Sequence, residues 1–443
     1  MANSTSTAHM PDPPVAPDPP VAPVPPVAPD PPVAPDPPAA AATDRSAYAA
    51  LFAICFVSST FGGVVSTLMS VYLPVAVKDL LGQVTDAKLN AVSAFINSVF
   101  IFGWMFGGVV WGLICDRIGR ARSVMLSTLC YGLFTVLTAL SPSWEMVVVC
   151  RLLSGFGVGG VLVTTTIMVS EAWTGKRRAV ALGILSISIP VGIFSAGLIN
   201  YLLPDWRQAF LTGIIPLLAA VAALLFLKES EKWKGRAADR ERSGASFLSP
   251  AYRKNLWIGS LIFGTMLIGM WAIFSWLPTW VQSLSGSSDA QHQRGVSMMM
   301  MGAGGLTGGF ISGWIAHAIG LRRTMSLCFA ICFGMAFLLF KLNHTFSGMA
   351  YGEIAILAIF FGISQGALSA YIPELFPTAV CAAATGFCFN VGRLFTATAV
   401  FFVGALVSLL GGYGNTLFIF SFIFLIGLIA TWATGKKVNP KNE

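Results

Sequence analysis

Charged residues are scarce in this chain. They make up 10% of its 443 residues, whereas 55% of the residues are hydrophobic, and the mean hydropathy is +0.75. A soluble globular chain carries about 25% charged residues, because its surface must be hydrated. Most of this protein's surface must therefore face an apolar medium, which excludes an ordinary soluble enzyme. The composition predicts a protein that crosses a lipid bilayer many times.

The chain also lacks the sequence patterns of several other chemistries. Its four histidines lie outside the centres of the apolar stretches and have no zinc or haem spacing. Its eight cysteines lie in or at the ends of apolar stretches, where they are typical of small buried side chains. No nucleotide-binding loop is present, and the basic residues form no stripe for phosphates despite a net charge of +8. We therefore expect no cofactor, no metal and no nucleic-acid partner.

Proline is concentrated near the start of the chain. Residues 11–40 contain five copies of a hexapeptide of the type Pro-Asp-Pro-Pro-Val-Ala. Proline at half of these positions excludes helix and sheet, and the segment lacks the basic start and apolar centre of a signal peptide. We interpret residues 1–44 as a disordered tail or spacer. A ligand for a proline-binding module is the alternative interpretation.

The rest of the chain contains twelve apolar stretches. Each is close to or above the ~20 residues that cross a bilayer as a helix. Six of them precede a basic connector, and six follow it. The stretches are 48–77, 91–114, 123–141, 146–171, 179–203, 208–227, 256–283, 296–319, 324–342, 350–373, 384–409 and 415–434.

Lysine and arginine are distributed unequally among the loops. If the N-terminus is inside, nineteen of these residues fall on the cytoplasmic side and five on the outside or at outer ends. Short cytoplasmic loops are enriched in both residue types, so both termini are predicted to be cytoplasmic. We expect a multi-pass protein of the bacterial plasma membrane, that is, the cell inner membrane.

A glycine pattern of the first half recurs in the second half. Close helix packing explains any one of these matches, but not eight matches in one register. A duplicated six-helix unit is the architecture of secondary transporters, in which the substrate binds between the halves. With a shift of 201 residues, the matching pairs are Gly103–Gly304, Gly107–Gly308, Gly108–Gly309, Gly112–Gly313, Ile114–Ile315, Ile118–Ile319, Gly119–Gly320 and Arg122–Arg323.

The sequence thus predicts an all-α membrane protein with twelve transmembrane helices in two pseudo-symmetric six-helix bundles. Its expected parts are the tail 1–44, a first bundle 45–227, a connector 228–255, a second bundle 256–435 and a C-terminal tail 436–443.

Two segments carry a family resemblance. The run GLICDRIGRAR, Gly112 to Arg122, resembles the loop signature between spans 2 and 3 of the major facilitator superfamily. The run that begins at Arg151, RLLSGFGVGG, resembles the span 4 pattern of that family, and DWRQAF and ESEKW resemble further family patterns. In the second copy of the loop, His317 stands where the first has Asp116. The resemblance covers residues 48–435 and implies transport by alternating access.

Charged residues near the ends of the stretches are candidates for a gate. In the first-half loop, an aspartate can face the N-terminus of another helix, and an arginine can pair with an acid such as Glu171. Pairs of this kind that break and re-form as the halves move would act as a latch. A static salt bridge that only sets the topology is the alternative. The candidate gate residues are Asp116, Arg120, Arg122, Arg151, Glu171 and Glu374.

An arginine inside the membrane requires a partner or a wet cavity, because burying it at mid-depth costs roughly 2.5–3.5 kcal/mol on insertion scales. Arg393 lies nine residues into the stretch 384–409, and no acid lies at a matching depth. This arrangement predicts that the substrate carries the negative charge. The alternative is a structural role, in which Arg393 bonds helix carbonyls and Asn390. The candidate substrate-binding residues are Ser59, Trp271, Gln365, Asn390 and Arg393.

The segment YIPELFPTAVCAAATGFCFNVGRLF resembles bacterial carboxylate carriers, namely the sialate and lactate proton symporters and the aromatic-acid symporters. This resemblance implies proton-coupled transport of a small organic anion. Two departures are Cys381, where an arginine is usual, and the first apolar stretch, which lacks the aspartate that many such symporters carry there. The matching residues are Glu374, Phe376, Pro377, Thr378, Gly392 and Arg393.

Two other functions remain open. One is a carrier or exporter of the same fold for a neutral solute such as a sugar. The other, a membrane enzyme or sensor, is disfavoured because no stretch offers a nucleophile beside a base. We expect a monomer whose partners are an anionic small molecule, protons and the lipid bilayer.

Overall fold

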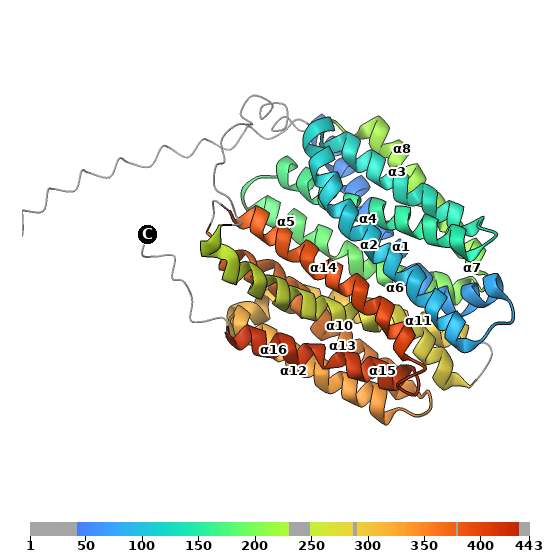
Figure 1. Ribbon diagram of the computed structural model, residues 1–443. Helices are drawn as coiled ribbons and strands as arrows, with labels where there is room; N and C mark the ends of the chain where they lie inside the picture. The colour runs from blue at the N-terminus through green and yellow to red at the C-terminus, as the bar shows by residue number, and fades with distance from the viewer. Residues whose placement is uncertain (1–41, 230–248, 287–289, 378–379, 434–443) are drawn as a thin grey trace, which may run out of the picture.

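A computed structural model describes residues 42–229, 249–286, 290–377 and 380–433. Within these ranges every regular element is a helix, and the helices form two groups, one above the other in Figure 1. The proline-rich repeat, most of the connector and the C-terminal tail lie outside the described residues.

The first group forms the blue to green part of Figure 1. The expected stretch 179–203 is split into two helices at Ile187, just before Pro190, which has no N–H to donate to the Ser186 carbonyl. The helices are α1 (Ala42–Leu81), α2 (Asp86–Ile118), α3 (Arg120–Ala139), α4 (Trp144–Ala172), α5 (Gly175–Ser186), α6 (Ser188–Leu202), α7 (Trp206–Phe210), η1 (Leu211–Gly213) and α8 (Ile214–Phe226).

The second group forms the yellow to red part. Its last expected stretch is split between two helices at Phe422. The helices are η2 (Pro250–Tyr252), α10 (Arg253–Ser285), α11 (Gln291–Ile319), α12 (Leu321–Phe337), η3 (Leu338–Leu342), α13 (Gly348–Tyr371), η4 (Pro373–Leu375), α14 (Cys381–Leu406), α15 (Tyr413–Ser421) and α16 (Ile423–Ala433).

Eleven helical segments in the described ranges are long and apolar enough to cross a membrane. α11 is not among them, although it has 29 residues. Its polar start, Gln-His-Gln-Arg, and its seven glycines keep its hydropathy low. The count of twelve expected from the sequence therefore depends on α11, which packs against both α13 and α6.

The matching glycines of the two halves make matching contacts. A Cβ atom on Gly107 would lie 2.0 Å from the Phe156 carbonyl oxygen, and one on Gly308 would lie 1.9 Å from the carbonyl oxygen of Ile359. Only glycine allows backbones to approach this closely. α2 thus packs on α4 in the first half in the way that α11 packs on α13 in the second.

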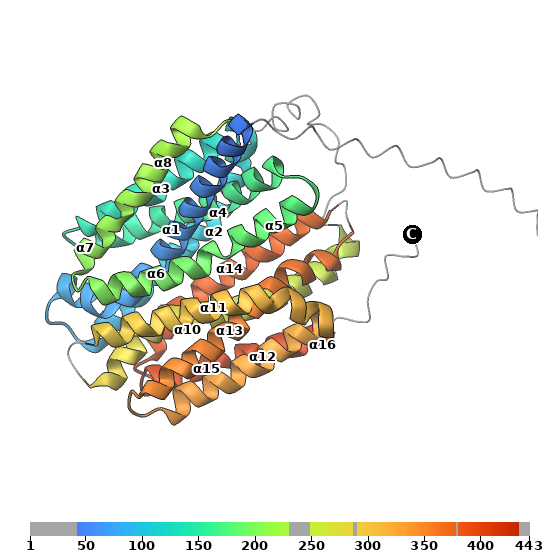
Figure 2. The ribbon, with the colours of Figure 1, turned by 180° about the vertical axis from the view of Figure 1, so that it is seen from behind.

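The two groups meet along two helix pairs, α6 with α11 and α2 with α14, and α1 also contacts α10. Figure 2 shows α6 and α11 side by side from behind. We call the end of the molecule where α2 turns into α3 the Arg120 end, and the opposite end, where α6 finishes, the Tyr201 end. The Arg120 end is on the left of Figure 1.

Contacts between the groups concentrate toward the Tyr201 end. There the Gln291 side-chain amide donates to the Asn200 carbonyl at 2.7 Å, and the Tyr413 hydroxyl donates to the Asn90 side chain at 2.5 Å. The Tyr201 and His292 rings are 4.5 Å apart.

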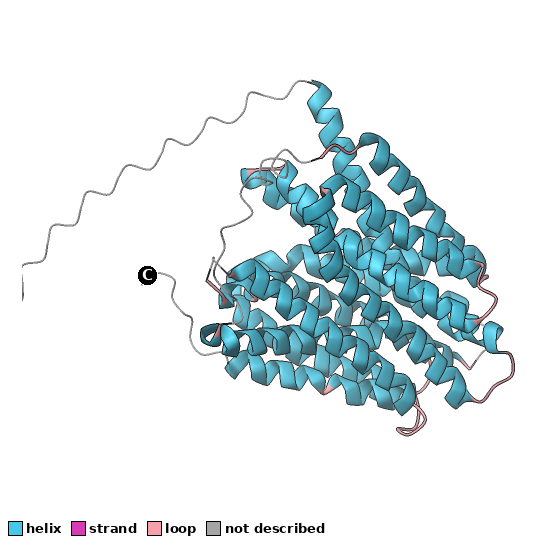
Figure 3. Ribbon diagram, turned by 45° about the horizontal axis from the view of Figure 1, so that its top comes forward, coloured by secondary structure: helices cyan, strands magenta, loops and turns pink. Residues whose placement is uncertain are grey.

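The same helix pairs separate toward the Arg120 end. Four glycines of α2, α5, α11 and α14 lie toward this end, and a Cβ on any of them would meet no atom of the described residues within 4 Å. Figure 3 shows the groups closer at the Tyr201 end and wider apart at the Arg120 end. The four glycines are Gly112, Gly183, Gly313 and Gly386.

Candidate functional site

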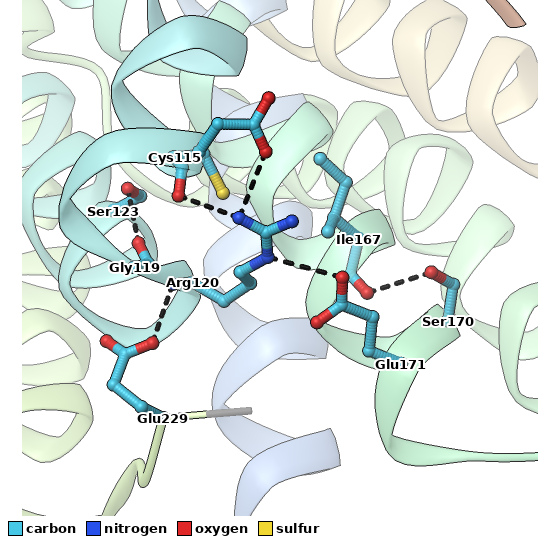
Figure 4. A network of polar contacts seen from close by, with 9 residues as sticks. Cys115, Gly119, Arg120, Ser123, Ile167, Ser170, Glu171 and Glu229 are labelled. Carbon is cyan, nitrogen blue, oxygen red and sulfur yellow. Dashed lines mark hydrogen bonds and ion pairs between the residues drawn. The ribbon is translucent and has the colours of Figure 1, made fainter. Parts of the chain in front are cut away.

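The first polar cluster is centred on Arg120 at the start of α3 (Figure 4). Gly119, with φ 107° and ψ 164°, turns the chain sharply between α2 and α3, and only glycine adopts this conformation readily. The turn lets the Arg120 guanidinium reach back to Asp116, with 3.0 Å between Nη1 and Oδ1, and to the Cys115 carbonyl at 2.9 Å.

The same guanidinium reaches α4. Its Nε lies 3.2 Å from Oε1 of Glu171, so the arginine–acid pair expected from the sequence is present. The Arg120 and Glu171 side chains are 4% and 8% exposed, whereas Asp116 is 62% exposed. The cluster therefore has a buried pair and an accessible one. A charged pair shielded from water is more sensitive to the loss of one partner than an exposed pair is.

Glu229, just after α8, was not predicted as part of this cluster. Its carboxylate accepts the backbone N–H of Arg120 at 2.7 Å and that of Arg122 at 3.1 Å. α3 has no acid in its first turn and no side-chain cap of its own, so Glu229 satisfies the N–H groups that a helix start leaves unpaired. The lack of a capping side chain at the start of α3 indicates that some other residue must fill this role, but the sequence alone does not identify it as Glu229. The Arg122 side chain itself is exposed.

The second copy of the loop is built differently. Gly320, with φ 85°, makes the same turn, but Leu321 occupies the position equivalent to Arg120. The Arg322 guanidinium instead donates to the carbonyls of Thr431 and Trp432, at 3.1 and 2.5 Å, at the end of α16. Glu374 is exposed and makes no hydrogen bond or ion pair within the described ranges. The structure does not bring it into a cluster like that of Glu171.

Arg151 lies far from the Arg120 cluster. Twenty residues of α4 separate it from Glu171, which is ~30 Å along a helix. Arg151 is 1% exposed, donates to the Val65 carbonyl at 2.9 Å and lies 3.9 Å from the centre of the Phe100 ring. These contacts join α4 to α1 and α2 within the first group.

The second candidate site lies between the halves, around Arg393 on α14. The Arg393 guanidinium carbon lies 5.8 Å from the centre of the Trp104 ring on α2, within the range of a cation–π contact. Trp104 in turn makes an edge-to-face contact with Trp271 on α10, with centroids 5.2 Å apart. Arg393 is partly exposed. It makes no hydrogen bond or ion pair with any part of the chain that the structure describes.

Gly392, the residue before Arg393, is the point at which α14 packs closely on α10. A Cβ on Gly392 would lie 2.6 Å from the Phe263 ring and 3.2 Å from the Gly264 backbone, so α14 lies tightly on α10 at this point. Arg393 lies against α2 instead. Trp104 is a member of this site that we did not predict, because a tryptophan among apolar residues is ordinary in a membrane helix.

The other predicted binding residues do not all lie beside Arg393. Asn390, one turn before Arg393, donates from Nδ2 to the Gly386 carbonyl at 2.9 Å, while its buried Oδ1 has no hydrogen-bond partner. The buried Nε2 of Gln365 on α13 also lacks a partner among the described residues. Ser59 lies elsewhere, within the first group, with its hydroxyl 2.9 Å from that of Thr165 on α4. Arg393, Asn390 and Trp271 are thus the predicted residues that gather around Trp104 and α14.

Comparison with known proteins gives the same fold and family. The profile of the Major Facilitator Superfamily matches residues 39–400. The cis,cis-muconate transport protein of Acinetobacter baylyi is 28% identical over 338 residues, which are 73% of this chain and 80% of that protein. The sialic acid transporter NanX of Escherichia coli is 25% identical over 374 residues, or 82% and 88%.

A solved structure shows the same fold. The inward-open xylose transporter XylE of Escherichia coli superposes with a TM-score of 0.71 at 15% identity, covering 89% of this chain and 98% of that one. The motifs, the helical architecture and the relatives agree. This chain belongs to the Major Facilitator Superfamily, and it is a membrane transporter and not an enzyme.

Proposed function

We propose that this protein is a secondary active transporter that moves a small organic carboxylate across the membrane by alternating access. Two six-helix bundles, residues 45–227 and 256–435, would provide twelve spans, with both termini in the cytoplasm. In this orientation the Arg120 end, where the bundles separate, faces the cytoplasm. The excess of basic residues in the loops at that end supports the assignment.

The observation that carries the proposal is the environment of Arg393. Its guanidinium lies between the two bundles, partly exposed, with an aromatic ring as its one described partner. A guanidinium has five N–H donors in a planar fork that matches a carboxylate. The unpaired Oδ1 of Asn390 lies one turn away and could accept a hydrogen bond from a hydroxyl or amide of the substrate.

The relatives support the same class of substrate. The muconate and sialic acid transporters are named for organic acids. By this analogy we propose a monomer in the inner membrane of a bacterium, with transport coupled to protons. The likeness to the xylose transporter concerns the fold alone, and a neutral sugar remains the alternative that the experiment must exclude.

We assign the Arg120 cluster to the gate. It lies at the end where the bundles separate and joins α2, α3 and α4 through Asp116, Arg120 and Glu171. Closing this end requires the bundles to approach each other beside the cluster. The latch would therefore control the rate of exchange between conformations and would not select the substrate.

Binding of acids and their amides to the purified protein tests the carboxylate proposal. The panel contains cis,cis-muconate, sialic acid and nicotinate, each with its neutral amide. Wild-type protein should prefer at least one acid, and Arg393→Ala should lose about tenfold to a hundredfold in affinity for it, the equivalent of one charge-assisted hydrogen bond.

The conservative variant separates charge from geometry. Arg393→Lys should recover binding only in part, because an ammonium retains the charge but loses the two-bond grip on a carboxylate. If wild-type protein shows no preference for any acid over its amide, the carboxylate proposal is wrong, and uptake of sugars becomes the next assay.

A further inference from the structure

We propose that a groove between α1 and α5, on the outside of the first bundle, binds one anionic phospholipid. The lipid phosphate lies on Arg177, and an acyl chain lies along the apolar wall of the groove. The lipid comes from the leaflet at the Arg120 end. This inference goes beyond the proposed function, because it involves neither the substrate nor the interface between the bundles.

The groove arises from the way in which α5 and α6 lie relative to α1. α6 packs closely on α1, because a Cβ on Gly192 would lie 2.3 Å from the Thr60 carbonyl oxygen. On the other side of the interruption at Ile187, α5 has little contact with α1. Figure 2 shows α1 beside α6, and α5 farther from α1 toward the Arg120 end. The interruption therefore leaves a space between α1 and α5.

A hollow of about 390 Å³ lies in this space. Pockets of this size accept small molecules, and this one can accept part of an acyl chain. Its lining is almost entirely apolar, and Arg177 is the one charged residue in it. The Phe52 and Trp173 rings form part of the wall, in an edge-to-face contact with centroids 5.8 Å apart. The lining residues are Phe52, Trp173, Arg177, Val180, Ala181 and Ile184.

The groove crosses the expected boundary of the membrane. The candidate membrane span that contains α4 ends at Ala172, and the next one begins at Val180. Trp173 and Arg177 therefore lie at the boundary, where tryptophan and basic residues are enriched. Ile184 lies ~6 Å farther in, at 1.5 Å per residue. The groove thus has a polar mouth at the level of the headgroups and an apolar part at the level of the acyl chains.

The exposed face of α6 shows that the groove opens toward lipid. Leu198 and Leu202 lie fourteen and eighteen residues after Ile184, about four and five helical turns, so all three share one face. All three are exposed. The two groups of helices are in contact at the Tyr201 end, so apolar side chains exposed there face the bilayer. The same face of α5, with Val180 62% and Ile184 44% exposed, is therefore directed to the acyl chains.

The charge of Arg177 favours an anionic headgroup. Its side chain is exposed and makes no hydrogen bond or ion pair with the described residues. A guanidinium can donate two N–H groups to a phosphate, and basic residues at the membrane surface attract anionic lipids. The lining contains no acid, so the ammonium group of a zwitterionic lipid would have no partner in the groove. We therefore expect phosphatidylglycerol to bind more tightly than phosphatidylcholine.

The test adds dioleoyl phosphatidylglycerol or dioleoyl phosphatidylcholine to the delipidated full chain in detergent. Native mass spectrometry measures the dissociation constant of each lipid, and thermal unfolding measures the stabilisation that binding causes. We expect about fivefold tighter binding of phosphatidylglycerol, the effect of one basic residue at the membrane surface. Inorganic phosphate has the charge without an acyl chain and should not displace the lipid.

Two variants separate the headgroup from the acyl chain. Arg177→Gln should abolish the preference for phosphatidylglycerol and leave the affinity for phosphatidylcholine unchanged. Ile184→Trp narrows the groove from its exposed rim and should weaken the binding of both lipids. Arg323→Gln is the matched control, because Arg323 is exposed at the same end of the second half and does not line the groove. It should keep the preference.

Three results would overturn the inference. They are equal affinities of wild-type protein for the two lipids, a preference that persists in Arg177→Gln, and unchanged binding of both lipids to Ile184→Trp. The proline-rich tail is another possible occupant of the groove. In that case phosphatidylglycerol would bind with preference only after deletion of residues 1–41, which would also overturn the inference. These measurements use no substrate, so their outcome is independent of the carboxylate proposal.

Discussion

Arg120 holds two acids of unequal importance. Its contact with Asp116 is exposed, and exposed ion pairs contribute about 0.2–1 kcal/mol. Its contact with Glu171 is buried, and loss of one partner from a buried pair costs about 3–5 kcal/mol. In the proposed gate we therefore expect the contact with Asp116 to open and close, while Glu171 keeps Arg120 in position.

Asp116→Asn should fold and insert but slow the exchange between conformations. We expect a fall in initial uptake of no more than about fivefold, the equivalent of one exposed ion pair. The dissociation constant for the substrate should stay unchanged, because the residue is at a helix end. Uptake rate and binding are measured on the same purified protein, with Glu145→Gln as a control for the loss of an exposed acid. Unchanged turnover in Asp116→Asn would remove the latch role.

The residues that the sequence identified are those that break a physical rule. Arg393 and Arg120 stand out because a charge within or beside an apolar helix requires a partner. Trp104 and Glu229 follow ordinary patterns, a tryptophan among apolar residues and an acid in a charged loop. Their roles arise from contacts with residues far along the chain, Arg393 and the start of α3, which a single sequence does not reveal.

Among the elements, α2 shows how one helix can have a fixed part and a free part. Gly107 lies against α4 with no space for a side chain, whereas Gly112, five residues on, has open space around it. α11 repeats this division with Gly308 and Gly313. The packed part joins α2 to its own bundle, and the open part belongs to the region where the bundles separate.

Alanine at these two glycines should have opposite effects on stability. Gly107→Ala places a Cβ 2.0 Å from a carbonyl oxygen, and overpacking of this kind costs about 1–3 kcal/mol or more. Gly112→Ala meets no atom and should stabilise the helix by about 0.4–1 kcal/mol. Thermal unfolding in detergent measures both. Equal melting temperatures for the two variants would contradict the contact between α2 and α4.

Helix breaks were predictable only where a residue causes them. Pro190 explains the interruption between α5 and α6, and glycine explains the turns at Gly119 and Gly320. The interruption at Phe422 has no proline or glycine beside it, and we have no physical account of it. The low apolarity of α11 has a tertiary cause, because glycines that weaken its hydropathy are the residues that let it pack on α13 and α6.

At the scale of the whole molecule, α1 begins at Ala42, inside the tail 1–44 expected from the sequence, and its start lies at the Arg120 end (Figure 1). Deleting residues 1–41 should leave uptake per inserted molecule unchanged, because a proline-rich hexapeptide array cannot pack into a helical bundle. Residues that follow the tail, in contrast, do pack on the first bundle. Tyr48 and Phe52 of α1 pack on Trp173, with ring centroids 5.6 and 5.8 Å apart.

A deletion of residues 1–52 is therefore the matched control, and it should lower the melting temperature because it removes both rings. Uptake and melting temperature are measured for both truncations. Loss of uptake after deletion of residues 1–41, in correctly inserted protein, would support a docking or regulatory role for the tail.

Glu229 has a consequence for how the two halves are joined. It is the second residue of the connector 228–255, yet its carboxylate accepts the backbone N–H groups of Arg120 and Arg122 in the first half. The contact of Glu229 with the start of α3 therefore lies within the N-terminal piece, and a cut later in the connector would leave this contact intact. Two separately encoded polypeptides, residues 1–240 and 241–443, should associate into a working carrier when produced together. Glu229→Ala in the piece 1–240 should impair the association of the two pieces more than it impairs the unbroken chain. Co-purification measures the association, and uptake measures the function of both forms.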